Sequence, residues 1–417
     1  MEQAIHLPKL RIGSRRIDVF PYWIGLLVIG LILGGIGAFQ VLTYGLSVTG
    51  LSNKVPWGLW IVIDLSSIAL GGSAFAMGVI VYILRIKRFE NIGKLAVITG
   101  FLGYTTAGMI LLLDLGQPFR FWHPIIFWQP HSLLWEITMC VVLYLTVLGL
   151  ELYPTVMEHP IFDRLPFLGW IAGVFHRFGP VLAVIGLTLS LLHQASLGAT
   201  YGVLTGRGLW FDPSAPVMFV LSAVGGGLAL LFAASVIVFR VMRPGLVSDA
   251  TLVDVARMAG VVLLLGAYLK IWDWAVSNYY SFDINVVTQV DLLNKVAPYS
   301  LSFWFGQIIF GAVVPGFVLL TYNKGGNLRL RTVVAMMAVI GVILVRWDYN
   351  FSGVIASITY DPFTPSAKLN SYLPTWQEYF VGAGVTSYWL LGFSLAARFL
   401  PFYTRHHEDH EKHLETV

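Results

Sequence analysis

Long apolar stretches dominate the sequence and leave few folds open to it. Each has about 20 or more residues with few charges, the length that a helix needs to cross the hydrocarbon core of a bilayer. Hydrophobic residues make up 57% of the 417 positions and charged residues only 12%, about half the share of charge in an ordinary soluble domain. The sequence therefore predicts an all-α polytopic membrane protein.

Ten of these stretches can be delimited. We expect membrane-spanning helices near residues 20–46, 57–84, 95–114, 131–153, 178–202, 215–239, 255–277, 300–321, 331–352 and 375–400. The first stretch is too long for the apolar segment of a signal peptide and lacks a convincing cleavage site, so we expect it to remain as a helix. We interpret residues 1–417 as a single transmembrane domain that ends in a cytoplasmic tail, 401–417.

Lysine and arginine are distributed unevenly between the loops. With the N-terminus in the cytoplasm, basic residues gather in the inner segments, such as 85–94 and 240–257, and are scarce in the outer ones. Cytoplasmic loops are enriched in lysine and arginine, so both termini are expected to be cytoplasmic. The net charge of +4 follows from these loops and indicates no nucleic-acid partner.

The outer loops and the C-terminal tail each allow two interpretations. The loops at 115–130, 278–299 and 353–374 are long and rich in aromatic residues, as in an interfacial belt facing the membrane lipids or a docking surface for an external subunit. The tail contains several histidines, which fit a solvated segment or a metal-binding one. These histidines are His406, His407, His410 and His413.

Ionisable residues within the apolar stretches are costly in hydrocarbon and therefore indicate functional positions. Nearly all lie in the outer half of the membrane, with Glu151 as the main exception. They are Asp64, Asp114, Glu136, His193, Lys270, Asp273, Arg346 and Asp348. The first four come from four consecutive helices, the second to the fifth, which predicts a four-helix bundle that holds a ligand in a polar chamber open to the outer side.

Structural roles are the alternative for several of these residues. His193 can be a hydrogen-bonded structural histidine, and Asp114 a simple interfacial acid at a helix end. The pairs Lys270–Asp273 and Arg346–Asp348 can be buried ion pairs that only join helices. A further structural feature is the group Gly71, Gly72 and Gly78, which we expect to permit close helix packing.

The sequence offers few ligands for redox cofactors. Cys140 is the only cysteine, and an iron–sulfur cluster needs several thiolates. A b-type haem between two helices needs paired axial ligands, and of the 10 histidines only His193 lies clearly within a predicted helix. We therefore expect neither haem nor an iron–sulfur cluster in this chain.

Five ordered motifs resemble the NrfD/polysulfide-reductase family of membrane subunits, in its ten-helix branch. They are Val55-Pro-Trp-Gly-Leu-Trp-Ile-Val-Ile-Asp64, Leu112-Leu-Asp-Leu-Gly-Gln-Pro118, Ser132-Leu-Leu-Trp-Glu136, Leu192-His-Gln-Ala-Ser-Leu-Gly198 and Tyr372-Leu-Pro-Thr-Trp-Gln-Glu378. The similarity extends over essentially the whole chain. That branch includes the membrane subunits of menaquinone reductase complexes and of hydrogenase-2-type complexes.

The resemblance implies a function and its partners. Family members carry no cofactor of their own, bind a quinone near the periplasmic face of the bacterial inner membrane, and dock against a ferredoxin-like iron–sulfur subunit. Menaquinone suits the anaerobic setting of the family. A menaquinone reductase complex fed by a multihaem cytochrome c is favoured over a hydrogenase complex, and molybdopterin-type subunits are further candidate partners.

The resemblance also assigns residues. Asp64, Glu136 and His193 would lie in or near the quinone pocket, and Asp114 would handle protons beside them. Trp57, Gln194 and Ser196 are the candidate lining residues. His193 is the natural proton donor to a ring carbonyl, because imidazole titrates near neutral pH.

Two rival functions belong to other classes. A secondary transporter usually has interrupted helices, repeated halves and a site at the midplane, whereas this sequence shows no internal repeat and its charges lie off-centre. A passive membrane anchor would have no reason to retain so many intramembrane acids. Both are less consistent with the sequence than a quinone-linked subunit.

Overall fold

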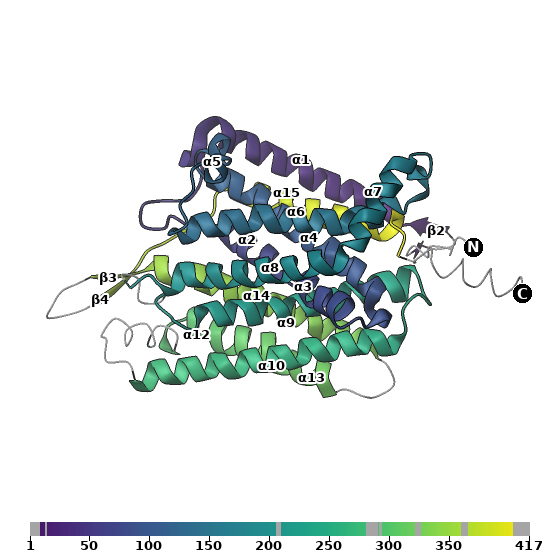
Figure 1. Cartoon of the computed structure of the whole chain (residues 1–417). Coiled ribbons are helices and arrows are strands. Elements are labelled where there is room, and N and C mark those ends of the chain that lie inside the picture. The colour runs from purple at the N-terminus through teal and green to yellow at the C-terminus, as the bar shows by residue number, and fades with distance from the viewer. Residues whose placement is uncertain are drawn as a thin grey trace, which may run out of the picture.

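In the computed structural model, the described residues form ten helices that are long and apolar enough to cross a membrane, which confirms the predicted number. The structure describes residues 9–12, 15–205, 210–280, 291, 294–321, 327–359 and 366–402. The helices run side by side along one direction (Figure 1). One end of the molecule carries α5 (His123–Ile126) and is called the α5 end; the opposite end carries α7 (Pro166–Arg177) and is called the α7 end.

Several of the spans are built from more than one helical segment. The first five spans are α1 (Phe20–Tyr44) with η1 (Gly45–Val48), α2 (Leu59–Leu70) with α3 (Ser73–Gly78) and η2 (Val79–Ile83), η3 (Lys87–Phe89) with α4 (Glu90–Asp114), α6 (Leu133–Met157) and α8 (Gly179–Gly202). The other five are α9 (Ala215–Ser235) with η6 (Val236–Met242), α10 (Asp249–Tyr280), α12 (Tyr299–Leu301) with η7 (Ser302–Val313) and α13 (Val314–Thr321), α14 (Leu328–Ile355) and α15 (Trp376–Phe399).

Some helices begin well before their predicted starts. Helix α10 begins at Asp249 rather than near residue 255, and α4 begins at Glu90 rather than near residue 95. Both added segments contain charged residues, among them Asp254 and Lys94. Hydropathy detects only the part of a helix that lies in hydrocarbon, so polar turns that project beyond it are missed.

Short elements outside the spans were not predicted. Strands β1 (Lys9–Ile12) and β2 (Arg15–Asp18) form an antiparallel pair at the α7 end, and β3 (Ala356–Thr359) and β4 (Ser366–Leu369) form another at the α5 end (Figure 1). The remaining elements are the 3₁₀ turns η4 (Pro118–Arg120) and η5 (Pro160–Phe162), together with α5 and α7. Of the tail at 401–417, only Pro401 and Phe402 belong to the described residues.

The eight central spans form two consecutive four-helix bundles. In the first bundle α2 packs on α4, α4 on α6, α6 on α8, and α8 on α3. In the second bundle α9 packs on α10, α10 on α13, η7 on α14, and α14 on α9. Helices α1 and α15 pack on each other beside the first bundle, where α15 contacts α4.

Glycine allows the two bundles to approach closely at Gly72, where α2 gives way to α3. A Cβ atom on Gly72 would lie 2.9 Å from the carbonyl oxygen of Ala223 on α9, and one on Gly227 would lie 2.6 Å from the backbone nitrogen of Ser73. The predicted packing role is therefore confirmed at Gly72. At Gly78 a Cβ atom would meet Ala183 only at the ordinary distance of 3.8 Å.

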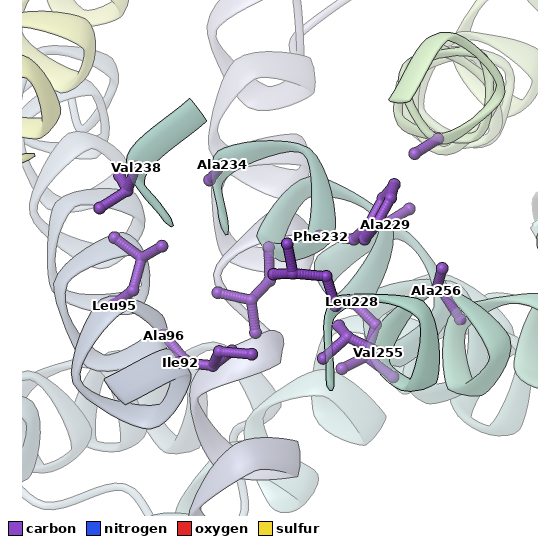
Figure 2. Close-up of a cluster of buried hydrophobic side chains, with 14 of the residues drawn as sticks. Ile92, Leu95, Ala96, Leu228, Ala229, Phe232, Ala234, Val238, Val255 and Ala256 are labelled. Carbon is purple, nitrogen blue, oxygen red and sulfur yellow. The ribbon is translucent and has the colours of Figure 1, made fainter. Parts of the chain in front are cut away.

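An apolar cluster joins α4, α9, η6 and α10 near the α7 end (Figure 2). Ile92, Leu95, Phe232, Val238 and Val255 are among its members, and each has at most 3% of its surface exposed. Charged groups buried among them would cost several kcal/mol each. These side chains form an apolar core. Buried groups such as Asp64, His193 and Asp348 lie nearer the α5 end, whereas the buried arginines Arg243 and Arg331 border the core at the α7 end.

A single methyl group tests the packing of the first helix on the last. Gly34→Ala places a Cβ atom 2.5 Å from the Cα atom of Gly384 on α15, whereas Gly35→Ala meets nothing within 4 Å. We expect Gly34→Ala to destabilise the protein by about 1–3 kcal/mol through this overlap. The measurement is the temperature at which half of the detergent-purified protein loses its monodisperse elution. Equal midpoints for Gly34→Ala and the control Gly35→Ala would contradict the packing described here.

Candidate functional site

Asp64 is a buried carboxylate near the start of the second span. It lies about 8 Å along α2 from Leu59, at 1.5 Å per residue, and only 3% of its surface is exposed. Its Oδ1 atom has no hydrogen-bond partner. A buried polar atom without a partner costs about 1–3 kcal/mol and more if charged, so this position favours a proton, a water molecule or a ligand on that oxygen.

His193 meets a tyrosine that sequence reasoning missed. The Nδ1 atom of His193 on α8 and the hydroxyl oxygen of Tyr104 on α4 are 3.1 Å apart, and both side chains are fully buried. The ring of Tyr104 packs edge-on against Tyr144 of α6, with centroids 4.7 Å apart. The Nε2 atom of His193 has no partner. Tyr104 therefore holds the imidazole at Nδ1, and Nε2 remains available for another partner.

Tyr104 and His193 lie at matching depth. Tyr104 precedes the end of α4 at Asp114 by about 15 Å, and His193 precedes the end of α8 at Gly202 by about 14 Å. Tyrosine is uncharged at neutral pH and common in membrane helices, so a search for ionisable residues passes over it. Its depth relative to His193 was the signal that could have identified it.

The residues next to His193 are tied to the neighbouring helices. Gln194 donates from Nε2 to the carbonyl oxygen of Ile68 at 3.1 Å, and its Oε1 atom has no partner. Ser196 donates to Oε1 of Glu136 on α6 at 2.8 Å. Glu136 is half-buried. Thus α8 is linked to α2 by one side chain and to α6 by another.

Asp114 connects this region to the α5 end. It is the last residue of α4, its Oδ1 atom is buried without a partner, and it lies close enough to Asp64 for the two carboxyl groups to interact electrostatically. Glu378 also lies within electrostatic range of Asp114. Glu378, Asp114 and Asp64 thus form a series of neighbouring carboxyl groups that begins at the α5 end.

Glu378 itself has a structural role at the start of α15. Its carboxylate accepts hydrogen bonds from the backbone nitrogens of Gly50 at 2.7 Å and Thr375 at 2.9 Å, an arrangement that caps the helix. The hydroxyl of Tyr372 also donates to it. Burial and this hydrogen bond raise the pKa of Tyr372, so the hydroxyl keeps its proton and remains a donor.

Trp57 lies in an aromatic cluster between the two bundles. It stacks on Trp210 with centroids 5.3 Å apart and meets the edge of Tyr201 at 5.4 Å. Asn350 of α14 donates to the carbonyl oxygen of Trp57 at 3.2 Å and accepts from the hydroxyl of Tyr201 at 3.3 Å. Trp57 is therefore held at the bundle interface, beside the start of α2.

The structure brings some of the predicted site residues together and leaves others apart. Asp64, Asp114, His193 and Gln194 lie in the first bundle with unpartnered polar atoms. Glu136 and Ser196 form their own pair on the α6 side, and no hydrogen bond between described residues joins Glu136 to Asp64 or His193. The polar residues that the sequence places in one chamber thus form two separate groups in the first bundle.

The interpretation of Lys270–Asp273 and Arg346–Asp348 as ion pairs is wrong for the described residues. Lys270 donates instead to Gln307 of η7, which donates to Asp348. Arg346 donates to the carbonyl oxygen of Phe219 at 3.1 Å, and its guanidinium lies 3.7 Å from that ring's centroid. Residues two apart on a helix do not face each other, which keeps Arg346 and Asp348 on different sides of α14.

Glu151, the exception in the inner half, lines a cavity of about 360 Å³ at the α7 end of the first bundle. Lys94 and Glu158, which form an ion pair at 2.8 Å, line the same cavity. The polar walls of this cavity lie between the apolar middle of the helices and the α7 end. Glu151 therefore belongs to a separate group of residues from His193 and Asp64.

Within the described residues, no group of three or more histidine, cysteine, aspartate or glutamate side chains is arranged to hold a metal ion. Cys140 is buried and free. The absence of haem stays a prediction, since it concerns what the purified protein contains.

The family model described as "Polysulphide reductase, NrfD" matches residues 47–355. The chain belongs to this family. That match includes both bundles, and the ten apolar helices make this NrfD protein an integral, multi-pass membrane protein.

Relatives of this NrfD protein include subunits of reductases and of a hydrogenase. It is 31% identical to the menaquinone reductase integral membrane subunit of Nitratidesulfovibrio vulgaris, over 94% of each chain. It is 26% identical to a selenate reductase subunit of Mesobacillus selenatarsenatis, over 92% of this chain and 94% of the relative. It is also 25% identical to the probable Ni/Fe-hydrogenase 2 b-type cytochrome subunit of Escherichia coli, over 89% of this chain and 90% of the relative.

The name of the last relative makes the haem content a useful measurement. We expect the reduced-minus-oxidised spectrum of this chain, purified without partners, to show no b-type haem bands, because a haem between two helices needs paired axial ligands and His193 is the only histidine in the ten described spans. The pyridine haemochrome assay gives the stoichiometry. One haem per chain would contradict the prediction.

Proposed function

We propose that this NrfD protein is the quinone-binding membrane subunit of a respiratory redox complex, and that it exchanges electrons between an external iron–sulfur subunit and menaquinone. The quinone ring occupies the first bundle near the α5 end. This end faces the periplasm, and both termini lie in the cytoplasm. The chain acts as one subunit of a quinone oxidoreductase and carries no haem or iron–sulfur cluster of its own.

The observation that carries the proposal is a set of buried polar atoms without partners in the first bundle. They are Oδ1 of Asp64, Oδ1 of Asp114, Nε2 of His193 and Oε1 of Gln194. Protein interiors normally satisfy such atoms, and hydrocarbon cannot. A quinone, which accepts hydrogen bonds when oxidised and donates them when reduced, is a ligand that can use both kinds of atom.

His193 is the residue best suited to a ring carbonyl. We assign the hydroxyl of Tyr104 as the donor to Nδ1, which leaves the proton of the imidazole on Nε2. This Nε2–H group can then donate to a carbonyl oxygen and stabilise the charge that develops on it during reduction. Tyr104 is the positioning residue that fixes the ring and its tautomer.

Carboxyl groups supply a route for the two protons of quinone chemistry. Asp64 and Asp114 interact electrostatically, and Asp114 in turn interacts with Glu378 near the helix end. A proton held by either member of such a pair reduces the repulsion between them. We propose that Asp64 exchanges protons with the quinone side and Asp114 with the α5 end. Glu136 and Ser196 form a second polar wall, and Trp57 and Gln194 line the pocket.

The α5 end is the proposed docking surface for the iron–sulfur subunit. Its loops expose large aromatic side chains, among them Phe119 at 80% and Trp128 at 65%. Such a patch marks a protein or membrane contact. The menaquinone reductase relative, which covers nearly the whole chain, supports a menaquinone reductase complex. We propose a multihaem cytochrome c as the electron donor of this complex, with a molybdopterin-type subunit as a further candidate partner.

Three alternatives remain distinct from this proposal. The hydrogenase relative supports a quinone-reducing subunit of a hydrogenase-2-type complex, which would use the same residues with another electron donor. A transporter would need a ligand at an interrupted helix. The interruption at Gly71–Gly72 is instead packed against α9, where Gly72 and Gly227 leave no room for a Cβ atom. A passive anchor has no use for the unpartnered atoms.

Removal of either central residue should stop quinone turnover. We expect Asp64→Asn and His193→Ala each to lower quinone-coupled activity by at least about 100-fold, the usual effect of losing a proton-transfer group, with the complex still assembled. Activity is measured with a soluble quinone analogue, and assembly by co-purification of the partner subunits.

The matched control is Asp249→Asn, which removes a carboxylate from a partly exposed ion pair with Arg240 at the α7 end. It should retain activity. Full activity of both Asp64→Asn and His193→Ala in assembled complexes would contradict the proposed site.

A further inference from the structure

A cavity of about 300 Å³ lies between the four helices of the second bundle, separate from the proposed quinone site. Polar side chains line its part nearest the α5 end, among them Lys270, Asp273 and Asp348. Its deeper part is lined by Val262 and Gly311. Pockets between the helices of a bundle that are mostly apolar, with a few placed polar groups, are typical small-molecule sites.

The polar end of the cavity is held in place by hydrogen bonds between helices. Lys270 of α10 donates to Gln307 of η7, and Gln307 donates to Asp348 of α14. Tyr349 donates to Asp212 at 2.6 Å. These contacts fix the side chains before any ligand arrives, which lowers the entropic cost of binding.

Aromatic side chains line the cavity near this polar end. Phe219 comes from α9, Trp274 from α10, Phe303 from η7 and Tyr349 from α14. The ammonium group of Lys270 lies 5.4 Å from the centroid of the Phe303 ring. Aromatic walls bind flat rings through stacked and edge-on contacts, and the ammonium group can donate to a carbonyl oxygen at the rim of such a ring.

Charge at the cavity argues against an anionic ligand. Asp212, Asp273 and Asp348 all line it, with Lys270 as the cation among its lining residues. Arg346 lies behind the Phe219 wall, fully buried, and its Nε and Nη1 atoms have no hydrogen-bond partner. A phosphate headgroup would meet more acids than bases here. A neutral ligand with a carbonyl oxygen avoids that repulsion.

We propose that the second bundle binds a second isoprenoid quinone, with the ring among the aromatic side chains at the polar end and the tail toward the deeper apolar part. The ring carbonyl accepts from Lys270, and the walls contributed by Phe219, Trp274 and Phe303 enclose the ring. The choice of a quinone as ligand rests on the proposed function, whereas the residues of this site are separate from those around His193.

Photolabelling with an azidoquinone in native membranes tests the site with the full chain in place. Gly266 lines the cavity, and a Cβ atom there would meet nothing within 4 Å, so Gly266→Leu fills the cavity without displacing a neighbour at the Cβ position. Ala312→Leu fills it from η7. The control is Gly35→Leu on α1, where a Cβ atom also meets nothing within 4 Å. Labelled peptides are identified by mass spectrometry.

In the wild-type protein we expect label both on α10 and α14 and on α2 and α8. Gly266→Leu or Ala312→Leu should lower labelling of the second bundle by about ten-fold or more, because the ligand must compete with a side chain for its space. Labelling of the first bundle should remain unchanged, and Gly35→Leu should leave both unchanged.

Three results would overturn the second site. They are no label in the second bundle of the wild type, a label that persists in both filling variants, and a label displaced by diacylglycerol but not by unlabelled quinone. The proposed function fails in a different way, since label confined to the second bundle would contradict the site at His193 and leave the second site standing.

Discussion

Hydrocarbon offers no hydrogen bonds, and this constraint determines where polar groups can lie in this protein. Each buried donor or acceptor must find a partner within the protein, in a ligand or in bound water. Backbone groups find theirs within their own helices, whereas some buried side chains do so across helix boundaries, as Gln194 does with Ile68 and Lys270 with Gln307. Side-chain atoms without a partner occur in both bundles, and those of the first bundle include Oδ1 of Asp64 and Nε2 of His193. The same constraint explains why the cluster of Figure 2, near the α7 end, joins the two bundles through apolar side chains.

The arrangement in two bundles gives the molecule two internal environments. The interface between them is built from small residues where the backbones are closest, at Gly72 and Gly227, and from aromatic rings nearer the α5 end, at Trp57 and Trp210. Asn350 of the second bundle bonds to the backbone at the start of α2. Asn350 thus ties α14 to the start of the helix that carries Asp64, in addition to the packing of α14 on α2.

The sequence predicts the helices better than it predicts the contacts between them. Ten spans follow from hydropathy alone, because the cost of burying backbone in lipid leaves a helix of about 20 apolar residues as the simplest solution. The polar turns of α10 before residue 255 and the strands at both ends lie outside hydrocarbon, where hydropathy carries no information. The depth of Asp64 and His193 could be read from their positions in the spans.

Partners on other helices could not be predicted in the same way. Tyr104 carries no charge and gives no signal until its helix is placed beside α8. The pairing of Lys270 with Asp273 is plausible by spacing, but Gln307 of another helix reaches Lys270 and Ser214 donates to Asp273. Rotation of each helix about its axis decides such contacts, and a single sequence does not determine that rotation.

The packing of α1 on α15 has a consequence for how the chain is made. The first helix meets its partner only after the rest of the protein has been synthesised, roughly 15–65 s later at ordinary translation rates of about 5–20 residues per second. During that interval α1 must remain in lipid without its partner. It is the most apolar and the least buried of the ten helices, so it is stable in lipid as an independent helix. Gly34, which has no side chain, leaves the space on its surface into which α15 later packs.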